Sequence, residues 1–305
     1  MAPIAGKSLN LRSIEIDLDQ FKIGLIAFGF ALSSAPGGPR LRVGNGRQRL
    51  RPPGKPMSIP RDGDKPLDNT FGRQSVSTDE RRQRIRDVFD HIASRYDLMN
   101  DLMSFGIHRL WKRRFVAGLP DQGLFVDLAG GTGDVAALLA RKPGRRVVVV
   151  DPSIPMMREG STRADAATVR WIAGEAERLP FADGSVQALT VSFGLRNTTR
   201  LDVALAEAAR VLAPGGTFAC LEFSRPMKWL QLFYDPYSFH VIPRLGAWVA
   251  ANPAAYQYLI ESIRNFPDQQ RFAAMIEAAG FSSVRWKNLS FGIAAIHLAT
   301  RPLVR

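Results

Sequence analysis

Apolar and polar residues first follow a regular pattern at Thr78, from where apolar side chains recur every three or four residues as far as Ile92. That spacing places them on one side of a helix. Ser77, directly before the pattern, is one of the residue types that cap helix N-termini. The pattern therefore predicts one amphipathic helix that begins near Thr78.

Farther along the chain, short apolar runs alternate with helical stretches. The runs that we interpret as strands are residues 124–128, 147–150, 188–193 and 217–223. The stretches that we interpret as helices are residues 135–141, 154–163 and 202–212. Strands separated by helices of about ten residues form parallel crossover units. We therefore predict the α/β class, with a doubly wound, Rossmann-like sheet that carries helices on both faces.

The first 56 residues differ from the rest. Residues 36–56 are rich in Pro, Gly and Arg, and such a segment cannot offset its ordering entropy by burial. The apolar run at residues 21–32 is shorter than the about 20 residues that a bilayer span needs. We predict that residues 1–56 are a disordered or non-native extension, residues 57–82 a linker, and residues 83–305 the folded domain.

The formal net charge of +13 would suit nucleic acid or an anionic membrane. However, residues 1–56 hold nine Lys or Arg against three acidic residues, so about half of the excess lies outside the predicted domain. We expect no nucleic-acid partner. Cys220, the one cysteine, lies in an apolar run and is expected to be buried. The four histidines lack the spacing of a metal site, so no metal is expected.

The strongest local motif is a glycine-rich turn at residues 125–134, which read FVDLAGGTGD. Glycines there let the backbone approach a ligand closely. Asp151, at the end of the next apolar run, is placed to accept the hydroxyl protons of a ribose. Asp127 would repel a pyrophosphate but suits a ligand with an ammonium and a sulfonium. The turn therefore favours S-adenosylmethionine over a dinucleotide, with Asp127, Gly131 and Gly133 among the cofactor-binding residues.

Several further motifs resemble those of a known family. GEAERLPFADG at residues 174–184 and LAPGG at residues 212–216 are similar to the motif series of class I methyltransferases. A sharper resemblance lies at residues 93–111, 192–197, 221–224, 237–244 and 261–264. Together these segments resemble the UbiE-type C-methyltransferases of ubiquinone and menaquinone biosynthesis, over about residues 83–303. The resemblance implies a class I methyltransferase sheet with N-terminal helices and an inserted helical lid.

The resemblance also implies a reaction. A methyl group would pass from S-adenosylmethionine to a ring carbon of a 2-methoxy-6-polyprenyl-1,4-benzoquinol, of demethylmenaquinol, or of both. Two alternatives stay open: a methyltransferase of another small molecule, and a non-catalytic protein that binds S-adenosylmethionine or a quinone. A homodimer and contacts with other quinone-biosynthesis enzymes are also left open.

The same resemblance implies cofactor contacts at Thr132, Asp151, Glu175, Ala176 and Ser192. Many similar chains have an amide or Asp where Glu175 stands, so its contact is expected to differ.

Two polar residues follow the predicted strand at residues 188–193, at the edge of the sheet where ligands of α/β proteins bind. Arg196 would stabilise a developing phenolate and Asn197 would orient the second oxygen; alternatively, both brace the loop. Tyr96, Tyr237 and His240 are further candidates for the quinol pocket.

Aromatic residues gather at residues 225–258, which hold eight of the 28 in the chain. They predict a lid at about residues 225–265 or a contact with lipid; packing of an inserted helical pair is the alternative. With the basic run Arg109 to Arg114, they predict a cytoplasmic protein that touches the membrane surface without spanning it.

Overall fold

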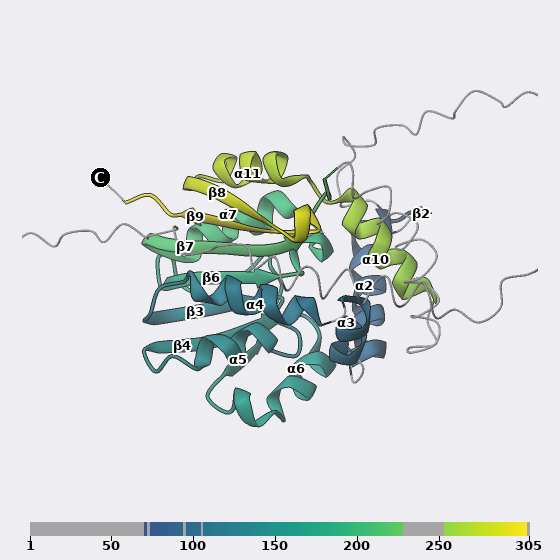
Figure 1. The fold of residues 1–305 in the computed structure, drawn as a ribbon, viewed down its shortest axis with the longest axis horizontal. Coiled ribbons are helices and arrows are strands. Elements are labelled where there is room, and N and C mark those ends of the chain that lie inside the picture. Colours follow the sequence, from purple (N-terminus) through teal and green to yellow (C-terminus); the bar gives the residue numbers. More distant parts are fainter. Residues whose placement is uncertain (1–69, 72–73, 94–95, 105, 228–252, 304–305) are drawn as a thin grey trace, which may run out of the picture. The chain divides into compact units, whose positions relative to one another are not determined.

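A seven-stranded sheet lies at the centre of the structure, a computed structural model that describes residues 70–71, 74–93, 96–104, 106–227 and 253–303 (Figure 1). Its strand order is β5-β4-β3-β6-β7-β9-β8. The bounds of these strands are β3 Gly123–Leu128, β4 Arg145–Asp151, β5 Arg170–Ala173, β6 Val186–Ser192, β7 Leu212–Phe223, β8 Ser282–Leu289 and β9 Ala294–Thr300. Two short strands, β1 (Thr70–Phe71) and β2 (Gln74–Ser75), pair separately.

The predicted parallel core is confirmed. Strand β3 pairs in parallel with β4 and with β6, and β6 pairs in parallel with β7. The four predicted strands correspond to β3, β4, β6 and β7, each longer than its apolar run at one or both ends. Strands β5, β8 and β9 were not predicted. The last of these, β9, lies between β7 and β8 and is antiparallel to both.

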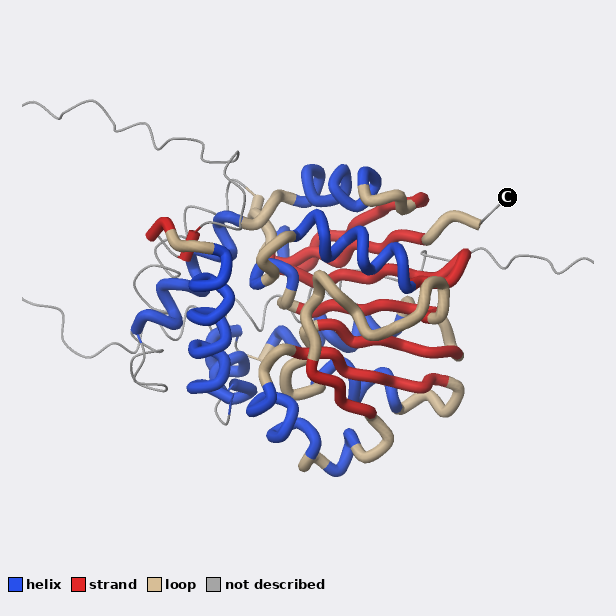
Figure 2. Tube along the Cα trace, turned by 180° about the vertical axis from the view of Figure 1, so that it is seen from behind, coloured by secondary structure: helices blue, strands red, loops and turns tan. Residues whose placement is uncertain are grey.

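Helices cover both faces of the sheet. On one face, buried side chains of α4 (Ile107–Ala117) and α5 (Asp134–Ala140) pack with the sheet residues Phe125, Val147 and Val149. On the other face, buried side chains of α7 (Leu201–Val211) and α11 (Gln269–Ala278) belong to one cluster with Val126, Val148 and Val150, which alternate along the strands with the residues of the first face. Figure 1 shows the face with α4 and α5, and Figure 2 shows the molecule from behind. Both faces of the central strands are buried, as their continuous apolar runs indicated.

Three further helices lie together beyond one end of the strands: α2 (Thr78–Ile92), α3 (Tyr96–Ser104) and α10 (Pro253–Asn265) (Figure 1). Helix α2 is the predicted amphipathic helix, and the Ser77 hydroxyl caps it by accepting a hydrogen bond from the Glu80 amide at 3.2 Å. Its buried Arg81 donates to the carbonyl oxygen of Thr198 at 2.7 Å. This bond ties α2 to the loop that follows β6.

The predicted lid at residues 225–265 is described only at its two ends. Helix α10 belongs to it, and Tyr258 of that helix is buried, stacked on Phe71 with ring centroids 4.7 Å apart. Residues 228–252, including Tyr237 and His240, lie outside the described residues. No helix in the described ranges is long and apolar enough to cross a membrane.

Candidate cofactor and substrate site

A cavity lies where β3, β4 and β6 end, and α2 and α3 contribute to its walls. Of the residues predicted for the site, it is lined by Tyr96, Gly131, Asp151, Glu175, Ala176 and Asn197. The lining does not include Asp127, Thr132, Gly133, Ser192 or Arg196. The carboxyl edge of the sheet was the expected position for such a cavity.

The glycine-rich turn owes its shape to backbone conformations that glycine favours. Gly131 has φ 55°, and a β-carbon there would lie 3.0 Å from the methyl carbon of Met156. Gly133 has φ 78°, and its β-carbon would lie 2.5 Å from the indole of Trp171. A side chain at Gly131 would therefore press on Met156 of the cavity lining, and one at Gly133 would clash with Trp171. The cofactor-binding role of Gly133 stays a prediction.

Asp151 is held rigidly at the end of β4. Its two carboxylate oxygens accept hydrogen bonds from the backbone amides of Gly131 and Ser153, each at 2.8 Å. Burial raises its pKa to about 6, although these two hydrogen bonds oppose the shift. A carboxylate oxygen can accept more than one hydrogen bond, so both oxygens are still able to accept from the hydroxyls of a ribose in the cavity.

Among the buried polar atoms without a hydrogen-bond partner in the described residues are Oδ2 of Asp127 on β3 and Oγ of Ser192 on β6, although neither residue lines the cavity. The other oxygen of Asp127 accepts from the Thr190 hydroxyl at 2.8 Å, and β3 and β6 pair at these residues. Burial raises the pKa of Asp127 to about 7. Buried polar atoms without partners are rare in folded proteins.

Glu175 and Ala176 form one wall of the cavity, and Glu175 pairs with an arginine of α2. Arg86 donates to Oε1 of Glu175 at 2.8 Å, and both side chains are partly exposed. The neighbouring Ala176 is buried. Because Glu175 is already paired with a cation, its contact with a nucleoside is expected to differ from the contact that an amide side chain would make at this position.

Arg196 lies outside the cavity lining and forms a buried ion pair. Its guanidinium donates to Oε1 of Glu222 at 2.7 Å and to the carbonyl oxygen of Phe193. The two side chains are 4% and 2% exposed. Burial raises the pKa of Glu222, and the guanidinium opposes the shift. These contacts support the alternative in which Arg196 braces the loop; its catalytic role stays a prediction.

Asn197 and Tyr96 are cavity residues with defined neighbours. Oδ1 of Asn197 accepts from the Tyr258 hydroxyl at 2.9 Å. Tyr96 packs edge-to-face on Phe89, with centroids 6.1 Å apart. Phe89 and Arg86 also line the cavity and were not predicted, although their spacing on α2 puts them on one side of that helix.

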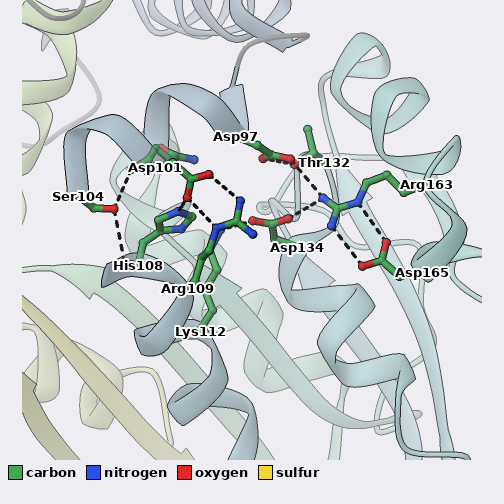
Figure 3. Close-up of polar contacts among 11 residues, drawn as sticks. Asp97, Asp101, Ser104, His108, Arg109, Lys112, Thr132, Asp134, Arg163 and Asp165 are labelled. Carbon is green, nitrogen blue, oxygen red and sulfur yellow. Dashed lines mark hydrogen bonds and ion pairs between the residues drawn. The ribbon is translucent and has the colours of Figure 1, made fainter. Parts of the chain in front are cut away.

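The basic run at Arg109 to Arg114 is less basic than expected. Arg109 donates to both carboxylate oxygens of Asp101, at 2.7 and 2.6 Å. Lys112 is buried and donates to Asp134 at 2.8 Å. Half of the four cations in this run are therefore committed to acidic side chains, as Figure 3 shows.

The described residues hold no group of three or more His, Cys, Asp or Glu side chains that could bind a metal ion. Cys220 is buried, as predicted. Burial raises the pKa of its thiol well above the usual value, so this thiol is a poor nucleophile.

A family model described as the ubiE/COQ5 methyltransferase family matches residues 77–301. A ubiquinone/menaquinone biosynthesis C-methyltransferase UbiE from Rubrivivax gelatinosus is 65% identical over 238 residues, which cover 77% of this chain and 94% of that protein. The protein of the same name from Paracoccus denitrificans is 51% identical over 242 residues, which cover 77% of this chain and 97% of that protein.

Solved structures match the fold at low sequence identity. A methyltransferase from Thermotoga maritima, described as a possible histamine N-methyltransferase, aligns with a TM-score of 0.53 and 19% identity, over 71% of this chain and 99% of that chain. The [4+2]-cyclase SpnF aligns with a TM-score of 0.53 and 14% identity, over 73% of this chain and 97% of that chain. The predicted Rossmann-like class I methyltransferase fold is confirmed. Because a cyclase shares it, the fold alone does not select the reaction.

Proposed function

Since this chain belongs to the ubiE/COQ5 methyltransferase family, we propose that it methylates a ring carbon of a polyprenylated quinol, with S-adenosylmethionine as methyl donor, in ubiquinone/menaquinone biosynthesis. The substrate is a 2-methoxy-6-polyprenyl-1,4-benzoquinol, demethylmenaquinol or both. The observation that carries the proposal is the 65% identity to a C-methyltransferase over nearly its whole length.

The residues around the cavity are suited to hold the methyl donor, which supplies an electrophilic sulfonium methyl group when bound. Asp151 would accept the ribose hydroxyls, and Glu175 and Ala176 would face the adenine. Asp127 and Ser192 would complete their hydrogen bonding on the methionine end. An ammonium beside Asp127 would stabilise its carboxylate and lower its pKa from about 7.

The quinol must be held with a ring carbon in line with the methyl group, and its ring becomes more electron-rich as a phenolic proton leaves. Tyr96 and Asn197, which line the cavity, are the described residues that would touch the quinol. Arg196 would act on the phenolate only through a change in its contacts with Glu222. Tyr237 and His240 stay candidates outside the described residues.

The proposed function is tested by incubating the chain with isotope-labelled S-adenosylmethionine and a short-chain benzoquinol or naphthoquinol under reducing conditions. The product should carry one labelled methyl group in place of a hydrogen on a ring carbon, and its mass should rise accordingly. The oxidised quinones, which are electron-poor, should not react. Binding of S-adenosylmethionine by calorimetry without turnover of either quinol would favour the non-catalytic alternative, and methylation on oxygen would favour another class of methyltransferase.

We propose further that the enzyme works at a membrane surface, because its substrate carries an isoprenoid. Leu98 and Ile154 are 54% and 50% exposed and adjoin the elements that line the cavity. In the basic run, Arg113 and Arg114 have no acidic partner among the described residues, and each cation adds about 1 kcal/mol near anionic lipid. Binding of the protein to the membrane surface should therefore be weak and sensitive to salt. The chain should float with anionic liposomes at low salt, and the Leu98→Ser/Ile154→Ser double variant should float less. Equal flotation of both would exclude this face.

We also propose that residues 1–56 are dispensable for folding and turnover. The family match begins at residue 77, and the composition of the segment does not favour a packed core. A chain that starts at Met57 should keep its melting temperature and its turnover. Insoluble or inactive protein after this truncation would contradict the proposal.

A further inference from the structure

Helix α3 is attached to the glycine-rich turn by one carboxylate. Oδ1 of Asp97 accepts a hydrogen bond from the Thr132 hydroxyl at 2.9 Å, and Oδ2 accepts from Arg163 at 3.2 Å (Figure 3). The residue before Asp97 is Tyr96, which lines the cavity. A single side chain thus contacts the glycine-rich turn while its neighbour in sequence lines the cavity.

Asp97 belongs to a network of charged side chains. Arg163 also donates to Asp134 at 2.6 Å, and Lys112 donates to the other oxygen of Asp134 at 2.8 Å. Burial raises the pKa of Asp134, but the two cations outweigh it and lower the pKa to about 2. Arg163 is therefore fixed between Asp97 and the first residue of α5, and it orients Asp97 toward the turn.

The hydrogen bond to Asp97 determines what the Thr132 hydroxyl can still do. A hydroxyl has one proton to donate and two lone pairs to accept with. Because an ionised carboxylate only accepts, the Thr132 proton must point to Asp97. Thr132 is buried and does not itself line the cavity, but it directly follows Gly131, which does. Toward a ligand that reaches it, the Thr132 oxygen can then only accept a hydrogen bond. At the methionine end of S-adenosylmethionine the ammonium is the one donor, whereas the carboxylate would need a donor.

We propose that Asp97 is a positioning residue: it orients Thr132 so that the oxygen accepts a hydrogen bond from the ammonium group of the cofactor, and it fixes α3 so that Tyr96 faces the quinol. This inference rests on the proposed function for the identity of the two ligands. It predicts two separable effects, one on the cofactor through Thr132 and one on the quinol through α3.

The first experiment measures binding of S-adenosylhomocysteine, and of an analogue with hydrogen in place of its amino group, by calorimetry. Asp97→Ala and Thr132→Val should each weaken S-adenosylhomocysteine about tenfold, which is about 1.4 kcal/mol. The double variant should be no weaker than either single variant, because the two residues act as a unit. Neither variant should change the affinity for the analogue. Thr132→Ser keeps the hydroxyl and should bind like the wild type.

The second experiment separates the two ligands kinetically. Asp97→Ala should raise KM for the quinol several-fold as well as KM for S-adenosylmethionine, whereas Thr132→Val should raise only the latter. Asp101→Asn is the matched control. Asp101 lies one turn along α3 and also pairs with a cation, Arg109, and with the His108 ring, but has no described contact with Thr132.

The inference is overturned if Asp97→Ala leaves the affinity for S-adenosylhomocysteine unchanged, if the analogue is weakened equally, or if Asp101→Asn has the same effects. If Asp97→Ala does not fold, the comparison of Thr132→Val with Thr132→Ser on the two ligands still decides the orientation of the hydroxyl. Wild-type protein that binds S-adenosylhomocysteine but methylates no quinol would contradict the proposed function and leave this test of Thr132 valid.

Discussion

Replacing Glu222 by Gln should lower the free energy of unfolding by about 3–5 kcal/mol. The carboxylate is 2% exposed and accepts from Arg196 at 2.7 Å and from the amide of Phe223 at 2.9 Å. Without its negative charge, the buried guanidinium of Arg196 has no described anion to neutralise it. Urea unfolding of the two proteins, followed by circular dichroism, measures the difference.

Two controls distinguish this effect from a general loss of charge. Asp202→Asn removes the acid of the exposed Arg200–Asp202 pair, whose side chains are 52% and 65% exposed, and should cost at most about 1 kcal/mol. Arg196→Met combined with Glu222→Leu removes both buried charges and should recover most of the stability that Glu222→Gln loses. A loss below about 1 kcal/mol for Glu222→Gln would show that the pair is solvated.

Replacing Asp151 by Asn should weaken the binding of S-adenosylmethionine about 10- to 100-fold at pH 7.5. A hydrogen bond to a charged group is worth about 1.5–3 kcal/mol, and Asn at this position can accept through only one of the two atoms. Calorimetry at a fixed salt concentration measures the affinity. An unchanged affinity would exclude Asp151 as the residue that binds the ribose.

The affinity of the unmodified protein should also depend on pH. Burial raises the pKa of Asp151 from 3.8 to about 6 in the free protein, and ribose hydroxyls would lower it again because they donate to the carboxylate. Affinity should therefore fall as the pH drops below about 6, by up to tenfold per pH unit from this group, and Asp151→Asn should lack this part of the dependence. The part due to Asp127, whose pKa of about 7 the ammonium of the cofactor would lower, should remain in the variant. The free energy of unfolding of the free protein should change with pH in the opposite direction to the affinity. Protonation of Asp151 stabilises the folded state fully below pH 3.8, and this contribution is lost as the pH rises through about 6.

The sequence predicts four strands of the parallel centre of the sheet, and it misses the antiparallel strands β8 and β9 for a physical reason. Strands β3, β4 and β6 are buried on both faces and therefore appear as continuous apolar runs. Strand β8 reads SSVRWKNL and is largely exposed, and β9 reads AAIHLAT, with small residues that also suit a helix. Strand β9 takes its place by pairing with the distant β7, and β8 by pairing with β9, and no local pattern encodes the long-range pairing.

The site residues also divide into those that a local motif predicts and those whose partners lie far away in the sequence. Asp151 and Gly131 could be predicted because the glycine-rich turn and the following strand end are contiguous motifs. The partners of the predicted residues lie far away in sequence: Asp97 is 35 residues from Thr132, and Glu222 is 26 residues from Arg196. Only the cavity side of α2 offered a usable local signal, the helical spacing of Arg86 and Phe89.

The position of β9 in the sheet affects how the chain folds during its synthesis on the ribosome. Strand β7 is complete at Phe223, but its neighbour in the sheet begins about 70 residues later, at Ala294. At about 5–20 residues per second, the ribosome leaves that side of β7 unpaired for roughly 4–14 s. Strands β8 and β9 are joined through Ser290–Gly292 and can form a hairpin before they meet β7. Until that hairpin docks, the nascent sheet presents an open edge of the kind that recruits chaperones or a second nascent chain.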